Sequence, residues 1–143
     1  MVKTSWVLSS IERDLHVDRF DIDDDDVKGT PDGWSVRKRT LRGGRRDGVD
    51  VIEIDNGAAE ITVVPSRGMG IWRVVSGDDR LGWRAPIKGP VHPREVNLGE
   101  PSGLGWLDGF DELLVRCGLE SNGAPEFDEE GRVVYPLHGK IAN

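Results

Sequence analysis

One histidine near the end of the chain, His138, stands where a titratable side chain could act on a ligand. It follows an apolar lead-in and precedes Gly139, which lets a ligand approach the backbone closely. Imidazole titrates near neutral pH, so it can protonate or hydrogen-bond an oxygen atom of a small molecule. His92 sits before a proline without such a context, and we interpret it as a packed or exposed residue.

A second segment that could do chemistry, residues 103–112, combines aromatic, acidic and glycine residues. Aromatic faces stack on the C–H face of a pyranose ring, and carboxylates accept hydrogen bonds from its hydroxyls. Trp106, Asp108 and Asp111 are therefore candidate sugar-binding residues. In the structural alternative, Trp106 and Phe110 fill the core and Asp108 caps a turn.

A third candidate, Arg67, lies in a segment where two glycines flank Met69. Such glycines mark a sharp reversal at which the backbone approaches another group closely. Two interpretations stay open. In one, the segment is a hairpin with an exposed Arg67. In the other, Arg67 points into a cleft and its guanidinium fork donates to ligand hydroxyls.

Other kinds of site find little support. A metal site needs three or four ligands at recognisable spacing, and the two histidines after the N-terminal segment are far apart. The acidic run at 21–26 lacks the glycine and the terminal glutamate of a calcium-binding EF-hand, which favours a solvated loop. We predict no metal and no cofactor. The single cysteine, Cys117, excludes an intramolecular disulfide, and we predict a buried structural thiol rather than a nucleophile.

These residues must be positioned by a mainly β protein. From residue 33 onward, short runs with strand patterning are separated by glycine-rich turns at the spacing typical of sandwiches, about 8–12 residues. Strands are expected at 34–41, 49–54, 59–64, 70–75 and 80–83. They predict an antiparallel meander.

The flanking segments differ from this meander. Residues 1–32 are predicted to be a polar N-terminal arm, in which residues 6–11 form one amphipathic turn. Prolines and glycines make residues 85–105 a binding loop or lid. A tight turn or short helix is expected at 106–110, and a buried strand at 112–119.

Composition narrows the choice of partner. The chain has 143 residues, 36% of them hydrophobic, and a net charge of −7. This acidity argues against nucleic acid and suits a neutral small molecule. No apolar run approaches the length of about 18 residues that a membrane span needs, and the N-terminal apolar stretch is too short for a signal peptide. We expect a cytoplasmic protein.

Five segments together resemble an uncharacterised branch of the aldose 1-epimerase, or galactose mutarotase-like, superfamily: 65–70, 81–83, 103–114, 116–120 and 136–143. The resemblance implies an antiparallel β-sandwich with a sugar cleft on one face and no cofactor. In such enzymes a glutamate takes the proton from the anomeric hydroxyl, and histidines protonate or hydrogen-bond the ring oxygen.

The resemblance also implies roles for single residues. His138 matches the histidine of the Leu-His-Gly motif, so its role is catalytic, at the ring oxygen. Arg67 would line the cleft. Lys140 is a further candidate substrate-binding residue. It stands where this branch is expected to have arginine, and lysine cannot reproduce a planar two-point contact with a substrate.

Members of this superfamily are much longer, and their catalytic glutamate and second histidine are expected beyond residue 143. Residues 33–143 are therefore predicted to be the N-terminal part of an incomplete sandwich, whose open edges favour pairing with a second chain. We expect a carbohydrate-active, mutarotase-like protein. The alternatives are a non-catalytic carbohydrate-binding module and an inactive structural fragment.

Overall fold

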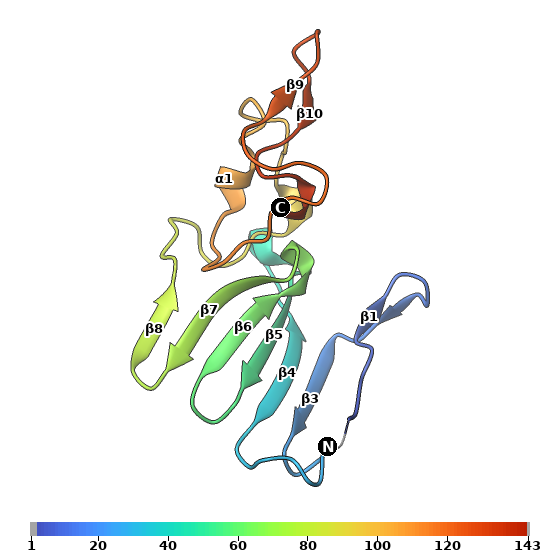
Figure 1. The fold of residues 1–143 in the computed structure, drawn as a ribbon, viewed down its shortest axis with the longest axis vertical. Coiled ribbons are helices and arrows are strands. Elements are labelled where there is room, and N and C mark those ends of the chain that lie inside the picture. Colours follow the sequence, from blue (N-terminus) through green and yellow to red (C-terminus); the bar gives the residue numbers. More distant parts are fainter. Residues whose placement is uncertain (1–2, 143) are drawn as a thin grey trace.

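A six-stranded antiparallel sheet forms the body of the molecule in the computed structural model, which describes residues 3–142 (Figure 1). Its strands lie side by side in chain order, so the sheet is a simple meander. They are β3 (Arg19–Asp23), β4 (Ser35–Thr40), β5 (Asp50–Asp55), β6 (Glu60–Val64), β7 (Gly70–Ser76) and β8 (Asp79–Gly82). The predicted antiparallel meander is confirmed, and its five expected strands correspond to β4 through β8.

Local sequence explains the turns of this meander. Between β5 and β6, Asp55 and Asn56 accept backbone N–H groups from residues 57–59, and Gly57 has a φ of 84°. Short polar side chains and a glycine with positive φ are what a tight hairpin needs. The turn fixes the register, so that Ile54 pairs with Ile61.

The sheet also contains β3, which lies inside the segment expected to be a polar arm. Apolar and polar residues alternate along this strand, and Ile22 is buried opposite Val36. The acidic run that follows obscures this alternation in the sequence. Part of the run that we expected to be a loop is therefore the end of an edge strand.

The first residues form a hairpin, β1 (Ser9–Ser10) with β2 (Leu15–His16), and not the predicted amphipathic turn. Ile11 lies between the two strands and is 99% exposed, so it cannot anchor a packed turn. Trp6 instead makes a tilted ring contact with Phe20 of β3, at 5.8 Å between centroids. The prediction failed because Trp6 packs against β3, whereas Ile11 belongs to the exposed turn between β1 and β2.

The hydrophobic core is small and lies where β4, β5 and β6 approach the irregular half of the molecule. Its buried members are Leu41, Val49, Val51 and Val64, and the partly buried Trp72 packs against them. The Leu41 N–H donates to the Val49 carbonyl and the Gly48 N–H donates to the Leu41 carbonyl, which extends the pairing of β4 and β5 beyond the strands. The core therefore stabilises the end of the sheet that lies next to the candidate site.

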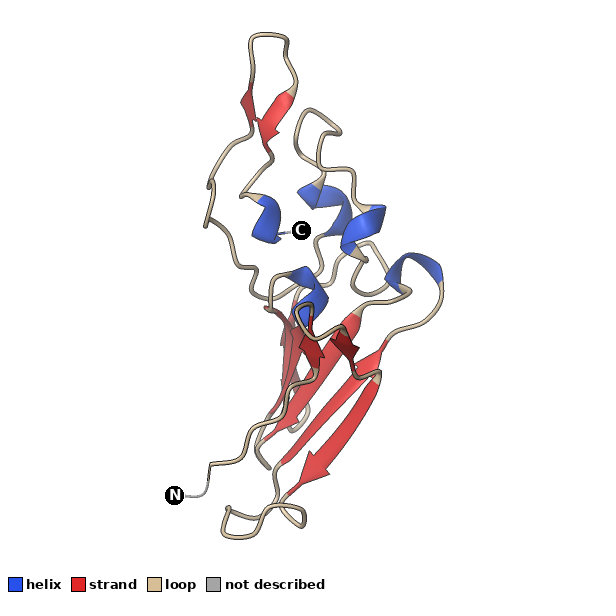
Figure 2. Cartoon of the chain, turned by 90° about the vertical axis from the view of Figure 1, so that its right-hand side faces the viewer, coloured by secondary structure: helices blue, strands red, loops and turns tan. Residues whose placement is uncertain are grey.

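The irregular half sits at one end of the sheet (Figures 1 and 2). It contains short helical turns and one hairpin: η1 (Gly44–Arg46), η2 (Pro65–Arg67), η3 (Pro93–Glu95), α1 (Trp106–Gly109), β9 (Glu126–Phe127), β10 (Val133–Tyr135) and η4 (Lys140–Ala142). The expected long loop and the short helix after it are both present. Within residues 3–142, no helix is long and apolar enough to cross a membrane.

The buried strand predicted at 112–119 is wrong. A single bridge joins this segment to the sheet, between Leu114 and Ile71, and Leu113 and Leu114 are exposed. The chain then turns at once, with another bridge between Gly118 and Ser121. Tertiary context overrides the strand propensity here, because β6 pairs with one side of β7 and β8 occupies the other side from Arg73 onward, so that this run bonds only to Ile71 and Trp72.

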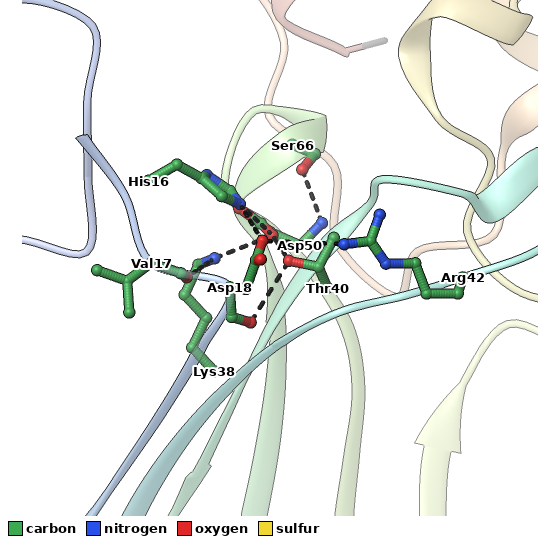
Figure 3. Close-up of polar contacts among 8 residues, drawn as sticks. All are labelled: His16, Val17, Asp18, Lys38, Thr40, Arg42, Asp50 and Ser66. Atoms are coloured by element: carbon green, nitrogen blue, oxygen red, sulfur yellow. Dashed lines mark hydrogen bonds and ion pairs between the residues drawn. The ribbon is translucent and has the colours of Figure 1, made fainter. Parts of the chain in front are cut away.

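A buried ion pair fastens the N-terminal segment to the sheet (Figure 3). The Lys38 ammonium lies 3.0 Å from an Asp50 carboxylate oxygen and donates to the Val17 carbonyl at 2.6 Å. The same Asp50 oxygen accepts from Thr40, and the Asp50 backbone donates to the Ser66 hydroxyl. All of these groups satisfy one another, which is the condition under which a buried charge pair is tolerated.

Replacing Lys38 with methionine keeps the apolar stem but removes the buried cation, which leaves the Asp50 carboxylate with the Thr40 hydroxyl and the His16 ring at 3.7 Å. We expect the free energy of unfolding in urea to fall by about 3–5 kcal/mol. Arg39→Met on the neighbouring position is the matched control, because the pair between Arg39 and Glu53 is half-exposed. That control is expected to lose less than about 1 kcal/mol. Equal losses would contradict the account.

Candidate functional site

Arg67 is the buried anchor of the irregular half. Its Nε donates to a Glu112 carboxylate oxygen, and its Nη1 donates to the Val91 carbonyl at 3.1 Å. Both charged side chains are fully buried. The hairpin interpretation with an exposed Arg67 is therefore wrong, and its fork is directed at Glu112 and Val91. Its role in binding sugar stays a prediction.

The glycines around Arg67 allow this close packing. A Cβ atom on Gly109 would lie 2.9 Å from Arg67 Nη1, and one on Gly68 would lie 2.1 Å from the Ile141 carbonyl oxygen. Gly68 also has a φ of 60°, a conformation that L side chains rarely adopt. Gly109 thus permits the close contact between the segments 65–70 and 103–109, and Gly68 permits the contact with Ile141.

Asp111 is a second buried acid beside this anchor. Its carboxylate accepts from the Trp72 indole N–H at 2.9 Å, and its backbone N–H donates to Glu112 at 3.0 Å. The pKa of Asp111 is raised to about 6, mainly by burial and also by the negative charge of Glu112, while the hydrogen bond from Trp72 acts in the opposite direction. Asp111 is only 4% exposed, so it supports Trp72 rather than facing solvent.

An apolar cavity of about 210 Å³, here called the aromatic pocket, lies beside α1. Its lining residues are Trp106, Phe110, Leu113, Val115, Cys117 and His138. Trp106 stacks on Phe110 with 4.4 Å between ring centroids, and the His138 ring meets Trp106 edge-on at 5.0 Å. The pocket therefore offers aromatic faces and one imidazole.

The backbone of His138 is fixed on both sides. Its N–H donates to the Gly123 carbonyl at 2.9 Å, and its own carbonyl accepts from Gly118 at 3.2 Å. His138 has a φ of 62°, which is uncommon for a residue with a side chain. Two loop contacts thus hold the imidazole at the pocket in a conformation that local preference does not favour.

The other predicted site residues do not join this pocket. Asp108 is exposed and forms an ion pair with Arg45, which lowers the pKa of Asp108. Lys140 is 66% exposed and lies 3.5 Å from Glu120. Of the six predicted site residues, the structure groups His138 with Trp106 at the pocket. It groups Arg67 with Asp111 around Glu112, and leaves Asp108 and Lys140 in separate surface pairs.

Sequence reasoning missed three members of this arrangement. Phe110 lies four residues after Trp106, a spacing that places two side chains on one face of a helical turn and could have revealed it. Cys117 is exposed at the pocket, so the predicted buried thiol is wrong. Glu112 pairs with a residue 45 positions away, which no local pattern signals. Among residues 3–142 no group of three or more potential ligands could hold a metal ion.

The raised pKa of Asp111 predicts a pH-dependent stability. The folded state holds this proton more tightly than the unfolded chain, so the stabilisation is complete below pH 4 and is lost as the pH rises through about 6. Asp111→Asn keeps an acceptor for the Trp72 N–H but cannot titrate. Urea unfolding from pH 3.5 to 7 should show wild-type stability falling relative to this variant. A difference that does not change with pH would contradict the prediction.

Comparison with known proteins supports the fold derived above. A crystal structure named "putative aldose 1-epimerase" from Klebsiella pneumoniae subsp. pneumoniae is 37% identical and superposes with a TM-score of 0.87. The match covers 96% of this chain and 36% of that chain, so this chain spans about a third of the relative's length. The predicted resemblance and the antiparallel β fold are confirmed.

The search of curated proteins finds no match. A family model described as "Domain of unknown function (DUF4432)" matches residues 46–143, which is more than half of the chain. Arg67 and all the residues that line the aromatic pocket fall within the matched residues. The chain therefore belongs to the DUF4432 family.

Proposed function

We propose that this chain contributes to a sugar-binding cleft of a mutarotase-like protein, which interconverts the anomers of an aldose. The observation that carries the proposal is that His138 shares one pocket with the stacked rings of Trp106 and Phe110. Aromatic faces and a titratable group within one cavity are what binding and opening a pyranose require. The relative named as an aldose 1-epimerase supports the same activity.

In this proposal the aromatic pocket binds the C–H face of the sugar, and His138 acts at the ring oxygen. The C1–O5 bond breaks as the ring oxygen gains a proton and the anomeric hydroxyl loses one. The C1 carbonyl of the open chain then rotates, and the O5 hydroxyl attacks its other face, losing its proton as the carbonyl oxygen gains one to become the anomeric hydroxyl. Histidine is the side chain used most often as a general acid or base, which suits His138 to the first transfer.

The second proton transfer needs a general base, and the pocket does not offer one. Its six lining residues include no carboxylate. Glu112 is buried in its pair with Arg67, and Asp111 accepts from Trp72. The base of this mechanism would therefore come from outside these residues.

This missing carboxylate favours the second candidate function, a non-catalytic sugar-binding module. Such a module needs only the aromatic faces and one polar group to orient the ligand. The two candidates predict the same binding surface and differ only in turnover. Sugar binding without accelerated anomer exchange would favour the module.

Anomer exchange of glucose and galactose, followed by NMR, tests the proposal directly. His138→Asn is the variant of choice, because asparagine tolerates the positive φ at this position better than other polar residues. We expect the variant to lose about 10²–10⁴-fold in rate, the range for a removed general acid. Trp fluorescence titrations with the same sugars measure binding separately.

His92→Asn is the matched control, because His92 caps η3 away from the aromatic pocket. It should exchange anomers at the wild-type rate. Exchange no faster than in buffer would rule out an enzymatic activity of this chain. Absence of any sugar-induced fluorescence change would rule out both candidate functions.

A further inference from the structure

A second cavity, of about 460 Å³, lies between residues 43–46 and 87–91 and is called here the basic pocket. It is more than twice the volume of the aromatic pocket and is not part of it. Three cations line it: Arg45, Arg46 and Lys88. None of its lining residues is acidic, although the whole chain carries a net charge of −7.

The cations of the basic pocket are only partly neutralised. Arg45 pairs with Asp108, but among the described residues Arg46 and Lys88 have no carboxylate within ion-pair distance. Arg46 makes one hydrogen bond, from Nε to the Arg42 carbonyl at 3.3 Å. Two positive side chains at this pocket are therefore available to a ligand.

Two acids in the segments that adjoin the lining already have partners. Asp47 accepts from the Gly43 backbone and lies 3.6 Å from Arg94. Glu95 lies 3.2 Å from the same Arg94. These contacts limit how far the neighbouring carboxylates offset the charge in the pocket.

The walls of the basic pocket are fixed to each other. The His92 backbone N–H donates to the Arg45 carbonyl at 2.7 Å, and Arg94 Nη2 donates to the Asp47 carbonyl at 3.2 Å. One wall carries Gly43 and Gly44, where an added Cβ would meet nothing within 4 Å. Bare backbone and open space at this wall give a ligand direct access.

We propose that the basic pocket binds a small oxyanion of the phosphate type, either free or as an ester on a larger molecule. A guanidinium fork and an ammonium group supply the donors that such an anion accepts. The cavity has room for a group attached to the phosphate. A polyanion such as nucleic acid fits poorly, because the acidity of the rest of the chain would repel it. The proposal is independent of sugar binding in the aromatic pocket.

Titration with inorganic phosphate, followed by amide NMR at low ionic strength, tests this site. The amides of Gly43, Gly44 and Gly89 should shift with saturation, and chloride at equal ionic strength should not reproduce the shifts. The double variant Arg46→Ala/Lys88→Ala removes both cations that have no ion-pair partner. It should bind phosphate at least about tenfold more weakly, which corresponds to roughly 1.4 kcal/mol of binding free energy.

The matched control is Arg37→Ala/Lys28→Ala, which removes the same charge from exposed positions outside the basic pocket. It should bind phosphate as the wild type does. A hexose 6-phosphate in a parallel titration distinguishes the sources: tighter binding than inorganic phosphate indicates an ester, and equal or weaker binding indicates free phosphate. Equal weakening in the two double variants, or identical shifts with chloride, would overturn the site.

Discussion

The buried ion pair between Arg67 and Glu112 is the constraint on which the rest of this structure depends. Both side chains are removed from water, so each would be strongly destabilising without the other. Glu112 also accepts from the Asp111 backbone, and Arg67 also donates to the Val91 carbonyl. The pair thus joins the end of the sheet, the long loop and the segment after α1 at one point.

The position of the aromatic pocket follows from this pair. Gly109 is the last residue of α1 and packs directly against the Arg67 guanidinium. Phe110, whose ring lines the pocket, is the next residue in the chain. Backbone hydrogen bonds from Leu113 and Leu114 to the start of β7 hold the following residues in place. Trp106 and Phe110 are therefore placed by a structural contact, and Arg67, which the resemblance placed in the cleft lining, serves that contact in this chain.

Alternation and turn chemistry in the sequence were enough to predict most of the sheet. The strands β5 and β6 alternate in part and meet at an Asn-Gly turn, which determines their pairing locally. The strand β3 was not predicted, because the acidic residues that follow it directly obscure its alternation. The false strand at 112–119 shows the reverse case, in which an apolar run pairs with a neighbouring strand only at Leu113 and Leu114 and is otherwise left without a strand partner.

The candidate site was predictable only where chemistry is local. His138 and Trp106 stand out by residue type and context, and the structure brings them to one cavity. The burial of Arg67 and the pairing of Glu112 depend on contacts between distant segments, which no spacing reveals. Asp108 was chosen for its place among aromatics, yet its carboxylate pairs with Arg45, which precedes it by 63 residues.

A double-mutant cycle on Arg67→Met and Glu112→Leu tests the central claim most directly. Each single variant leaves a buried charge without its partner, so each should lose about 3–5 kcal/mol of unfolding free energy in urea. The double variant should recover much of that loss, which gives a coupling energy of about 2 kcal/mol or more. Additive losses, with no recovery in the double variant, would contradict the dependence of this structure on the Arg67–Glu112 pair.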